Sequence, residues 1–341
     1  MKQTRVAVIG AGYFGQFHYD SWARMYDCAL VAMCVRPGED ASTTAMRYGV
    51  EAMYEDPVVM VETTEPDIVD IVAPPVAHHS IIASIAGKVK WIICQKPFCE
   101  NLDEAREVAE LIENSSSRLV IHENIRFQPW YREINRLLQS GAIGTPYQVS
   151  FRLRPGDGQG HDAYLDRQPY FQKMPRFLVR ETAVHWIDTF RFLFGEVSSI
   201  SADLHRLNPA IAGEDAGVLQ MTFKNGARGL FDGNRLVDHP ATNRRLTMGE
   251  MLLEGSDGTI SLDGDARIAR RIKGSTDWVP HAYPWANRNF GGDCVFSTNR
   301  AALEALRNDV TVENEVAAYI RNLELVEAAY QSNAERRWID V

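Results

Sequence analysis

The first 25 residues combine a short apolar strand, a glycine turn and a helix in immediate succession. Residues 6–9 are apolar and mostly β-branched, which is typical of a strand buried on both faces. Gly10, Gly12 and Gly15 follow in GxGxxG spacing, and large apolar residues then recur at roughly helical intervals. Such glycines permit a tight turn, close approach of a pyrophosphate and close helix packing. The segment therefore predicts a dinucleotide site, in which the helix N-terminus attracts the phosphates and Tyr13 and Phe14 lie beside the cofactor.

Strand and helix patterns alternate up to about residue 123. We expect further strands at residues 29–35, 48–54, 67–72, 91–94 and 119–122, with helices at 76–87 and after Asn101. Glu104, three residues after Asn101, completes a capping-box pattern. Strands that alternate with helices pair in parallel through right-handed crossovers, so the first 123 residues predict a doubly wound sheet.

The pattern changes after residue 123 to one rich in hairpins. Helices are expected at residues 130–138 and 183–194, and a half-buried strand at 147–154. Strands and turns fill residues 198–272, where 224–226, 256–258 and 263–264 carry hairpin turn signals, and two helices at 296–307 and 313–331 follow. The 341-residue chain thus predicts an α/β protein with a dinucleotide-binding domain at 1–123 and an α+β domain at 124–341, built on a large, mostly antiparallel open sheet.

Composition narrows the classes of partner. The net charge of −9 argues against a nucleic-acid partner, which needs a basic surface. No apolar stretch is long enough to cross a membrane, and the run after Arg5 lacks the features of a signal peptide. The five cysteines form no disulfide framework or zinc pattern, so we expect buried thiols in a cytoplasmic protein.

The end of the second strand bears on the choice of cofactor. An NAD site usually has an acidic residue about twenty positions past the glycines, whereas Val35 and Arg36 stand here. A guanidinium attracts the 2′-phosphate of NADP, which a carboxylate would repel. We expect NADP, with NAD still open because Arg36 could simply cover the adenine and because Glu39 is close in sequence.

Gln95 and Lys96 follow the strand at 91–94. In an open α/β sheet, the carboxyl ends of the strands face the ligand crevice. Lys96 could there donate to a substrate oxygen and to the nicotinamide ribose. The alternative is a solvated surface lysine, which is the usual state of this residue type.

The helix expected at 183–194 and the residues just before it carry a third set of candidate site residues. On a regular helix, Glu181, His185 and Asp188 would share one face. Histidine is the side-chain type that can act as a base for an alcohol proton near neutral pH, so His185 is a candidate base, and Glu181 could orient its ring. The alternatives are that His185 has a purely structural role or that it binds a metal ion. No second His/Cys cluster with ligand spacing supports a metal, so none is expected.

Taken together, the motifs resemble the Gfo/Idh/MocA family of nicotinamide-dependent oxidoreductases over nearly the whole chain. The matching features are the glycine turn, Ala73-Pro74-Pro75 with His78, Gln95-Lys96-Pro97, Asn124-Ile-Arg126-Phe127-x-Pro129, Ser140-Gly141-x-Ile143-Gly144, and the Glu181…His185 segment. The resemblance implies a Rossmann domain followed by an α/β domain whose open sheet often forms oligomer contacts, here a homodimer or homotetramer.

The resemblance also implies roles for individual residues. Lys96 would contact substrate and nicotinamide ribose, His185 would transfer the proton, and Pro74 would lie beside the nicotinamide, with His78 close to the cofactor. Two residues depart from the family pattern. Gln95 stands where Glu is usual, which removes a charge near Lys96, and Glu181 stands where Asp is usual.

The expected activity is hydride transfer between the nicotinamide and a CH–OH group of a sugar, inositol, polyol or sugar acid. Besides Lys96 and His185, the residues expected to contact this substrate are Arg126, Tyr164, Tyr170 and Arg180. Two alternatives are a glycosidase or lyase that uses the nicotinamide cofactor without net redox change, and a non-catalytic dinucleotide-binding regulator. The sequence does not identify the substrate or the preferred direction.

Overall fold

The computed structural model describes residues 3–341, which group by contact into two compact units. The first contains the residues up to Asn124 together with Val295–Arg321, and the second contains Ile125–Cys294 and Asn322–Val341. A single boundary near residue 124 therefore omits the return of residues 295–321 to the N-terminal unit. Each unit buries an apolar core of its own.

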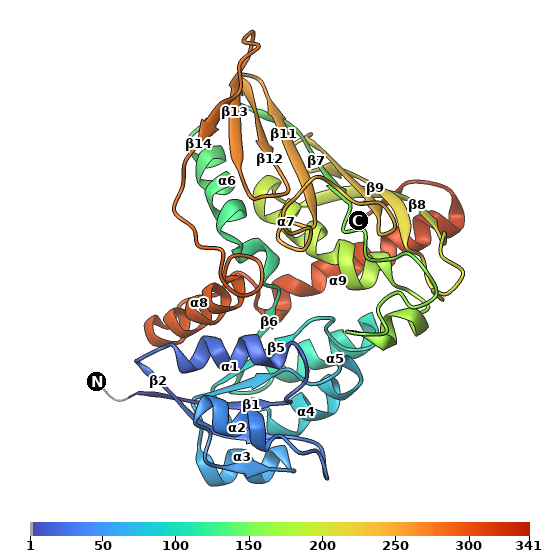
Figure 1. The fold of residues 1–341 in the computed structure, drawn as a ribbon. Coiled ribbons are helices and arrows are strands. Elements are labelled where there is room, and N and C mark those ends of the chain that lie inside the picture. Colours follow the sequence, from blue (N-terminus) through green and yellow to red (C-terminus); the bar gives the residue numbers. More distant parts are fainter. Residues whose placement is uncertain (1–2) are drawn as a thin grey trace. The chain divides into compact units, whose positions relative to one another are not determined.

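A six-stranded parallel sheet forms the centre of the first unit. Its strands are β1 (Thr4–Ile9), β2 (Cys28–Cys34), β3 (Met53–Tyr54), β4 (Ile68–Ile71), β5 (Trp91–Gln95) and β6 (Arg118–His122). Their order in space is β3-β2-β1-β4-β5-β6 (Figure 1). The order reverses between β1 and β4, and ligands of doubly wound sheets bind at such a switch point, outside the carboxyl ends of the strands. The predicted fold class is confirmed.

Helices cover this sheet, and two of them were not expected from the sequence. The helices are α1 (Gly15–Ala23), α2 (Ser42–Tyr48), α3 (Pro57–Thr64), α4 (His78–Ile85), which follows the 3-10 turn η1 (Pro75–Ala77), and α5 (Leu102–Glu113). The strand expected at 48–54 is wrong except for Met53–Tyr54, because α2 extends to Tyr48. Asn101 caps α5 as predicted, since its Oδ1 accepts a bond from Glu104 N at 2.9 Å. Helix α8 (Cys294–Asn308) adds Ala302 and Leu303 to the same core.

The second unit is built on a nine-stranded mixed sheet. Its spatial order is β14-β13-β12-β11-β7-β10-β9-β8-β15, and only the β7–β10 pair is parallel. The strands are β7 (Pro146–Leu153), β8 (Val197–His205), β9 (Ala216–Phe223), β10 (Arg228–Asn234), β11 (Gly249–Gly255), β12 (Gly258–Leu262), β13 (Ile268–Ile272), β14 (Val279–His281) and β15 (Ile339–Asp340). The three predicted hairpin turns join β9 to β10, β11 to β12 and β12 to β13, as expected.

One face of this sheet packs against helices. Helices α6 (Pro129–Gln139), α7 (Val184–Phe194) and the second part of α9 (Val316–Glu335) contribute to a core shared with the strands (Figure 1). Trp186 of α7 stacks on Phe151 of β7 with ring centroids 4.3 Å apart. Its indole N–H also donates to the Tyr131 hydroxyl of α6 at 3.1 Å. These two contacts hold the start of α7, and with it the neighbouring His185, in a fixed orientation.

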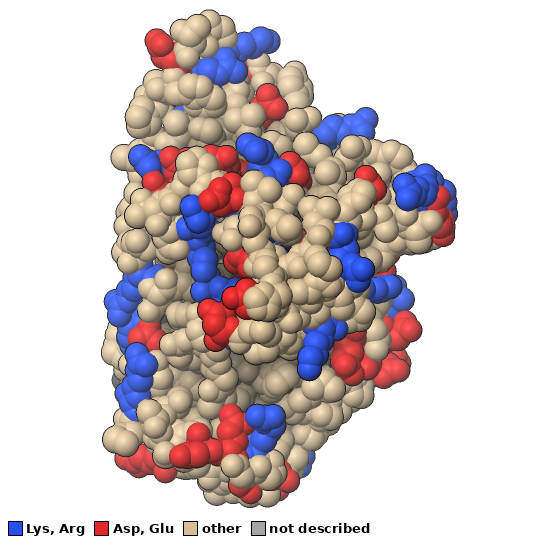
Figure 2. Space-filling view, turned by 45° about the vertical axis from the view of Figure 1, so that its right-hand side comes forward, with Lys and Arg blue, Asp and Glu red and all other residues tan. Residues whose placement is uncertain are grey.

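Surface charge and hydropathy are those of an ordinary globular protein. Acidic and basic side chains are interspersed on the face drawn in Figure 2. Within residues 3–341, no helix is both long and apolar enough to cross a membrane. All five cysteines are buried and none forms a disulfide, as the sequence predicts.

Candidate cofactor and catalytic site

The glycine turn after β1 has the shape that a dinucleotide requires. Gly10 has a φ of +104°, and a Cβ atom there would lie 2.9 Å from the carbonyl oxygen of Val72. Only glycine therefore fits between the ends of β1 and β4. A Cβ on Gly12 would meet nothing within 4 Å, so this backbone faces open space, and one on Gly15 would touch Val72 at 3.4 Å. The turn thus offers an accessible backbone cradle at the start of α1, which fits a pyrophosphate.

The side chains around this turn differ in exposure. The Tyr13 ring is 45% exposed, while Phe14 occupies the N-cap position of α1. Arg36 follows β2 with an 81% exposed side chain, and its Nε donates to Glu39 Oε2 at 2.9 Å. The guanidinium is accessible to a ligand, but a neighbouring carboxylate already partly balances its charge.

His78 supports the turn that follows β4. Pro74 starts the turn after β4, and His78 begins α4 with its ring fully buried. His78 Nε2 donates to the carbonyl of Ala73 at 2.8 Å. Burial lowers the pKa of His78 to about 4, so the ring is neutral near pH 7. The contact makes His78 a support for the Pro74 turn.

Gln95 is the last residue of β5, and Lys96 follows it. Gln95 is buried, and its Oε1 accepts a bond from the backbone N–H of Lys96 at 2.8 Å. Beneath it lie two groups that sequence reasoning missed, His18 of α1 and Asp70 of β4. The sequence did contain a signal for them, because Asp70 interrupts an otherwise apolar buried strand and His18 comes three residues after the last glycine.

The segment before α7 is a π-helical turn, η4 (Leu178–Ala183), rather than part of a regular α-helix. Glu181 lies in this turn and His185 lies in the first turn of α7, and both are 6% exposed. The prediction that Glu181 belongs to one regular α-helix with His185 and Asp188 is therefore wrong. A π turn is wider than an α turn and redirects the side chains that it carries, which is why such turns occur often at functional sites.

Two contacts from distant parts of the chain hold the π turn in place. The Glu214 carboxylate accepts bonds from the backbone N–H groups of Phe177 and Val179, at 3.2 and 3.1 Å. On the other side, Arg235 Nη1 donates to the Thr182 hydroxyl at 2.7 Å. The residues on both sides of Glu181 are thus hydrogen-bonded to residues outside the helix.

The residues expected to contact substrate fall into two groups. Tyr170 is half exposed, and partial burial together with the Glu181 carboxylate raises its pKa. Arg180 precedes Glu181 in the π turn. Tyr164 is 4% exposed, and its hydroxyl accepts from Arg235 Nε at 2.7 Å and donates to Asp157 at 3.2 Å. Both hydrogen-bonding roles of Tyr164 are used inside the protein, so its geometry favours a structural role.

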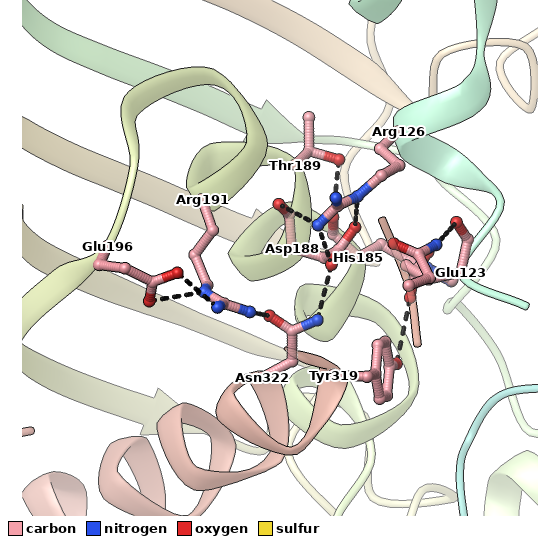
Figure 3. Close-up of polar contacts among 10 residues, drawn as sticks. Glu123, Arg126, His185, Asp188, Thr189, Arg191, Glu196, Tyr319 and Asn322 are labelled. Carbon is pink, nitrogen blue, oxygen red and sulfur yellow. Dashed lines mark hydrogen bonds and ion pairs between the residues drawn. The ribbon is translucent and has the colours of Figure 1, made fainter. Parts of the chain in front are cut away.

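Arg126 is also committed to a buried contact. Its guanidinium donates to both carboxylate oxygens of Asp188, at 2.6 and 2.5 Å. Asn322 Nδ2 donates to the same carboxylate at 2.6 Å, and Asn322 Oδ1 accepts from Arg191 at 2.7 Å. Figure 3 shows these side chains as one continuous chain of polar contacts around the first turns of α7. This arrangement favours a positioning role for Arg126 over a contact with substrate.

Metal ligands do not gather at these positions. In the part of the chain that the structure describes, no group of three or more His, Cys, Asp or Glu side chains is arranged to hold a metal ion.

Comparison with known proteins identifies the family. Residues 4–123 match the family model described as GFO_IDH_MocA, oxidoreductase family, NAD-binding Rossmann fold. Residues 131–261 match the GFO/IDH/MocA C-terminal domain. The chain belongs to the Gfo/Idh/MocA family of oxidoreductases. The resemblance inferred from the motifs is confirmed.

Individual relatives cover the chain from end to end. The chain is 31% identical to a D-apiose dehydrogenase from Paraburkholderia graminis, over 100% of this chain and 90% of the relative. It is 28% identical to a D-apiose dehydrogenase from Rhizobium rhizogenes, over 100% of this chain and 98% of the relative. Among solved structures, an oxidoreductase from Agrobacterium radiobacter in complex with NAD+, L-tartaric acid and magnesium is 27% identical, with a TM-score of 0.88 over 99% of this chain and 98% of that one.

Proposed function

We propose that this Gfo/Idh/MocA oxidoreductase is a dehydrogenase that oxidises a secondary alcohol of a sugar or polyol, using a nicotinamide dinucleotide as hydride acceptor. The observation that supports it most directly is the open glycine cradle between β1 and α1, in which Gly12 leaves room for a pyrophosphate. The six-stranded unit would hold the dinucleotide, with Gly10, Gly12 and Gly15 at the pyrophosphate and Pro74 beside the nicotinamide.

The nicotinamide ring supplies a hydride acceptor when the cofactor is bound. His185 takes the proton from the substrate hydroxyl as the carbon loses its hydride, so that a carbonyl forms. Lys96 donates to the same oxygen and stabilises the negative charge that develops on it. Glu181 orients the imidazole of His185. In the reverse direction His185 returns the proton.

The substrate class is supported by relatives and by Tyr170. Two full-length relatives are D-apiose dehydrogenases, which makes D-apiose the first substrate to test. The half-exposed Tyr170 ring offers an apolar face of the kind that packs on a sugar ring. We therefore propose a small sugar or polyol without a phosphate group.

For the cofactor we propose that Arg36 contacts the adenosine ribose and favours NADP, while NAD also binds. No carboxylate occupies the end of β2, where it would repel a 2′-phosphate, and the Arg36 side chain is 81% exposed. The bond from Arg36 to Glu39 reduces this preference, because the carboxylate already neutralises part of the positive charge.

The proposal is tested by mixing the protein with NAD+ or NADP+ and D-apiose, myo-inositol, scyllo-inositol or levoglucosan. Formation of reduced cofactor, followed by absorbance, would support a dehydrogenase. Product without reduced cofactor would instead indicate a reaction with no net redox change. Cofactor binding without any product across a broader sugar panel would contradict an enzymatic role.

A further inference from the structure

A buried row of polar side chains runs from the middle of the parallel sheet to Lys96. Asp70 Oδ2 lies 2.8 Å from His18 Nδ1, and His18 Nε2 lies 3.4 Å from Gln95 Nε2. Gln95 Oε1 then meets the backbone N–H of Lys96 at 2.8 Å. His18 and Asp70 are fully buried, and Gln95 is 7% exposed. The row therefore lies in a dry environment, where each hydrogen bond requires a donor matched to an acceptor.

The two ends of the row fix where its protons lie. A backbone N–H can only donate, so the Gln95 atom facing Lys96 is the carbonyl oxygen and the atom facing His18 is the amide NH2. His18 Nε2 must then accept. At the other end, Trp22 Nε1 can only donate, and it contacts Asp70 Oδ2 at 2.7 Å, so that oxygen is an acceptor and His18 Nδ1 carries the hydrogen. Both ends select the same state, a neutral imidazole protonated at Nδ1.

We propose that Asp70 and His18 are positioning residues for Lys96. The row orients the Gln95 amide, and the amide holds the backbone N–H of Lys96, which sets the direction of the lysine side chain. This inference rests on the proposed function, in which Lys96 donates to the substrate oxygen. It also gives a physical reason for the glutamine that stands at position 95.

A glutamate at position 95 would require one more proton among the side chains of the row. Its carboxylate can only accept, so His18 would need a second proton, at Nε2, to donate to it. No neighbouring group among the described residues can supply this proton in place of His18. His122 packs its ring 4.2 Å from that of His18, and burial lowers the pKa of His122 to about 3, so it stays neutral. Glu123, next to His122, is itself acidic and buried. The glutamine thus limits the row to one carboxylate and a neutral ring.

Nitrogen-15 NMR of the histidine side chains tests the proton arrangement without any enzymatic turnover. The His18 resonances are assigned by their loss in His18→Gln. In the wild-type protein with bound cofactor, near neutral pH, we expect a pyrrole-like Nδ1 and a pyridine-like Nε2. In Gln95→Glu both nitrogens should become pyrrole-like. A pyrrole-like His18 Nε2 in the wild-type protein would overturn the proposal.

Kinetics test the consequence for Lys96. Gln95→Leu should lower kcat by ~10–100-fold, as expected for loss of a supporting hydrogen bond, while cofactor affinity stays near wild type. Gln95→Glu should lower kcat as well, because its carboxylate cannot donate to His18 Nε2. The exposed Gln139→Glu adds the same charge in the other unit and serves as the matched control.

The outcomes separate the two proposals. Wild-type kcat in Gln95→Leu, with the protein folded by circular dichroism, would contradict positioning of Lys96 by the row. Absence of turnover in the wild-type protein, with the neutral His18 tautomer observed, would remove the proposed function and leave the proton arrangement standing.

Discussion

Arg126 and Asp188 form a two-point contact, in which Nε and Nη2 of the guanidinium donate to the two carboxylate oxygens at 2.6 and 2.5 Å. The two side chains are 9% and 1% exposed, so the pair is shielded from water. Asp188 lies one turn after His185 on α7, and its carboxylate also accepts from Asn322 of α9. The contact therefore ties the candidate base to two other segments of its own unit.

Breaking this pair should destabilise the protein strongly. Arg126→Met leaves the Asp188 carboxylate buried without its main partner, which costs ~3–5 kcal/mol in comparable buried pairs. We expect that loss in the free energy of unfolding measured with urea. Arg126→Met combined with Asp188→Leu should recover much of it, because no buried charge remains. The exposed Arg228→Met should change stability by less than ~0.5 kcal/mol. A stability of Arg126→Met within that same small margin would show that the pair contributes little.

The glycine turn allows cofactor binding and folding to be separated by two similar substitutions. Gly12→Ala adds a methyl group to open space, so the melting temperature should stay near wild type while the methyl group obstructs the pyrophosphate. We expect a loss of at least ~10-fold in NAD+ or NADP+ affinity, measured by quenching of tryptophan fluorescence. Gly10→Ala should instead unfold at a lower temperature, because its φ is +104° and the new Cβ would lie 2.9 Å from Val72 O. Unchanged cofactor affinity in Gly12→Ala would argue against a pyrophosphate at this turn.

Burial of His78 predicts a loss of stability in acid. Its pKa is about 4 in the folded protein, against about 6.5 when unfolded, so the unfolded state binds a proton first as the pH falls. The free energy of unfolding should therefore be highest above pH ~6.5 and decrease toward pH ~4, by up to ~3 kcal/mol from this group. His122 adds to the same trend, because burial lowers its pKa to about 3.

His78→Gln keeps an N–H group that can reach Ala73 but has no proton to take up, so its stability should depend less steeply on pH over this range. The adjacent His79 has a 40% exposed side chain, and His79→Gln is the matched control that should keep the wild-type slope. Urea unfolding at several pH values measures both. Equal slopes for the two variants would mean that His78 does not carry the effect.

The choice between the two nicotinamide cofactors can be read from Arg36 and Glu39. Arg36→Ala should lower kcat/KM for NADP+ by ~10–100-fold, the loss of a charge-assisted contact, and leave NAD+ nearly unaffected. Glu39→Ala should act in the opposite direction, because it releases the guanidinium from its 2.9 Å contact. Steady-state kinetics with both cofactors give the ratio. If Arg36→Ala changed both cofactors equally, Arg36 would have no part in recognising the 2′-phosphate.

Local patterns were sufficient for most of the fold. Strands β1, β4, β5 and β6 are short apolar runs buried on both faces, and such runs are visible in a single sequence. The two-residue strand β3 is too short to show a period, and α2 was hidden in the segment next to it. The return of residues 295–321 to the first unit depends on packing of α8 against a core formed far earlier in the chain, which no local pattern encodes.

In the candidate site, too, contacts between residues far apart in the sequence could not be predicted. The glycine turn and the Asn101 cap depend on neighbours in sequence and were predictable. The partner of Arg126 is 62 residues away, and the partner of His18 is 52 residues away, so their pairing follows only from the folded chain. The π turn that carries Glu181 depends on the Glu214 carboxylate from a different segment. Regular helical spacing therefore does not apply at Glu181.

The two proposed catalytic side chains should fail in different ways when removed. Lys96→Met removes the donor to the substrate oxygen, and His185→Ala removes the proton acceptor. Each should lower kcat by at least ~100-fold, while cofactor still binds. Added imidazole should restore part of the activity of His185→Ala, and it should not help Lys96→Met, because it can replace a base but not a positioned cation.

The exposed His205→Ala, in the same unit as His185, should keep wild-type kcat. Near wild-type turnover in either Lys96→Met or His185→Ala would remove that residue from the mechanism, and loss of activity in His205→Ala would show that the assay reports on stability instead.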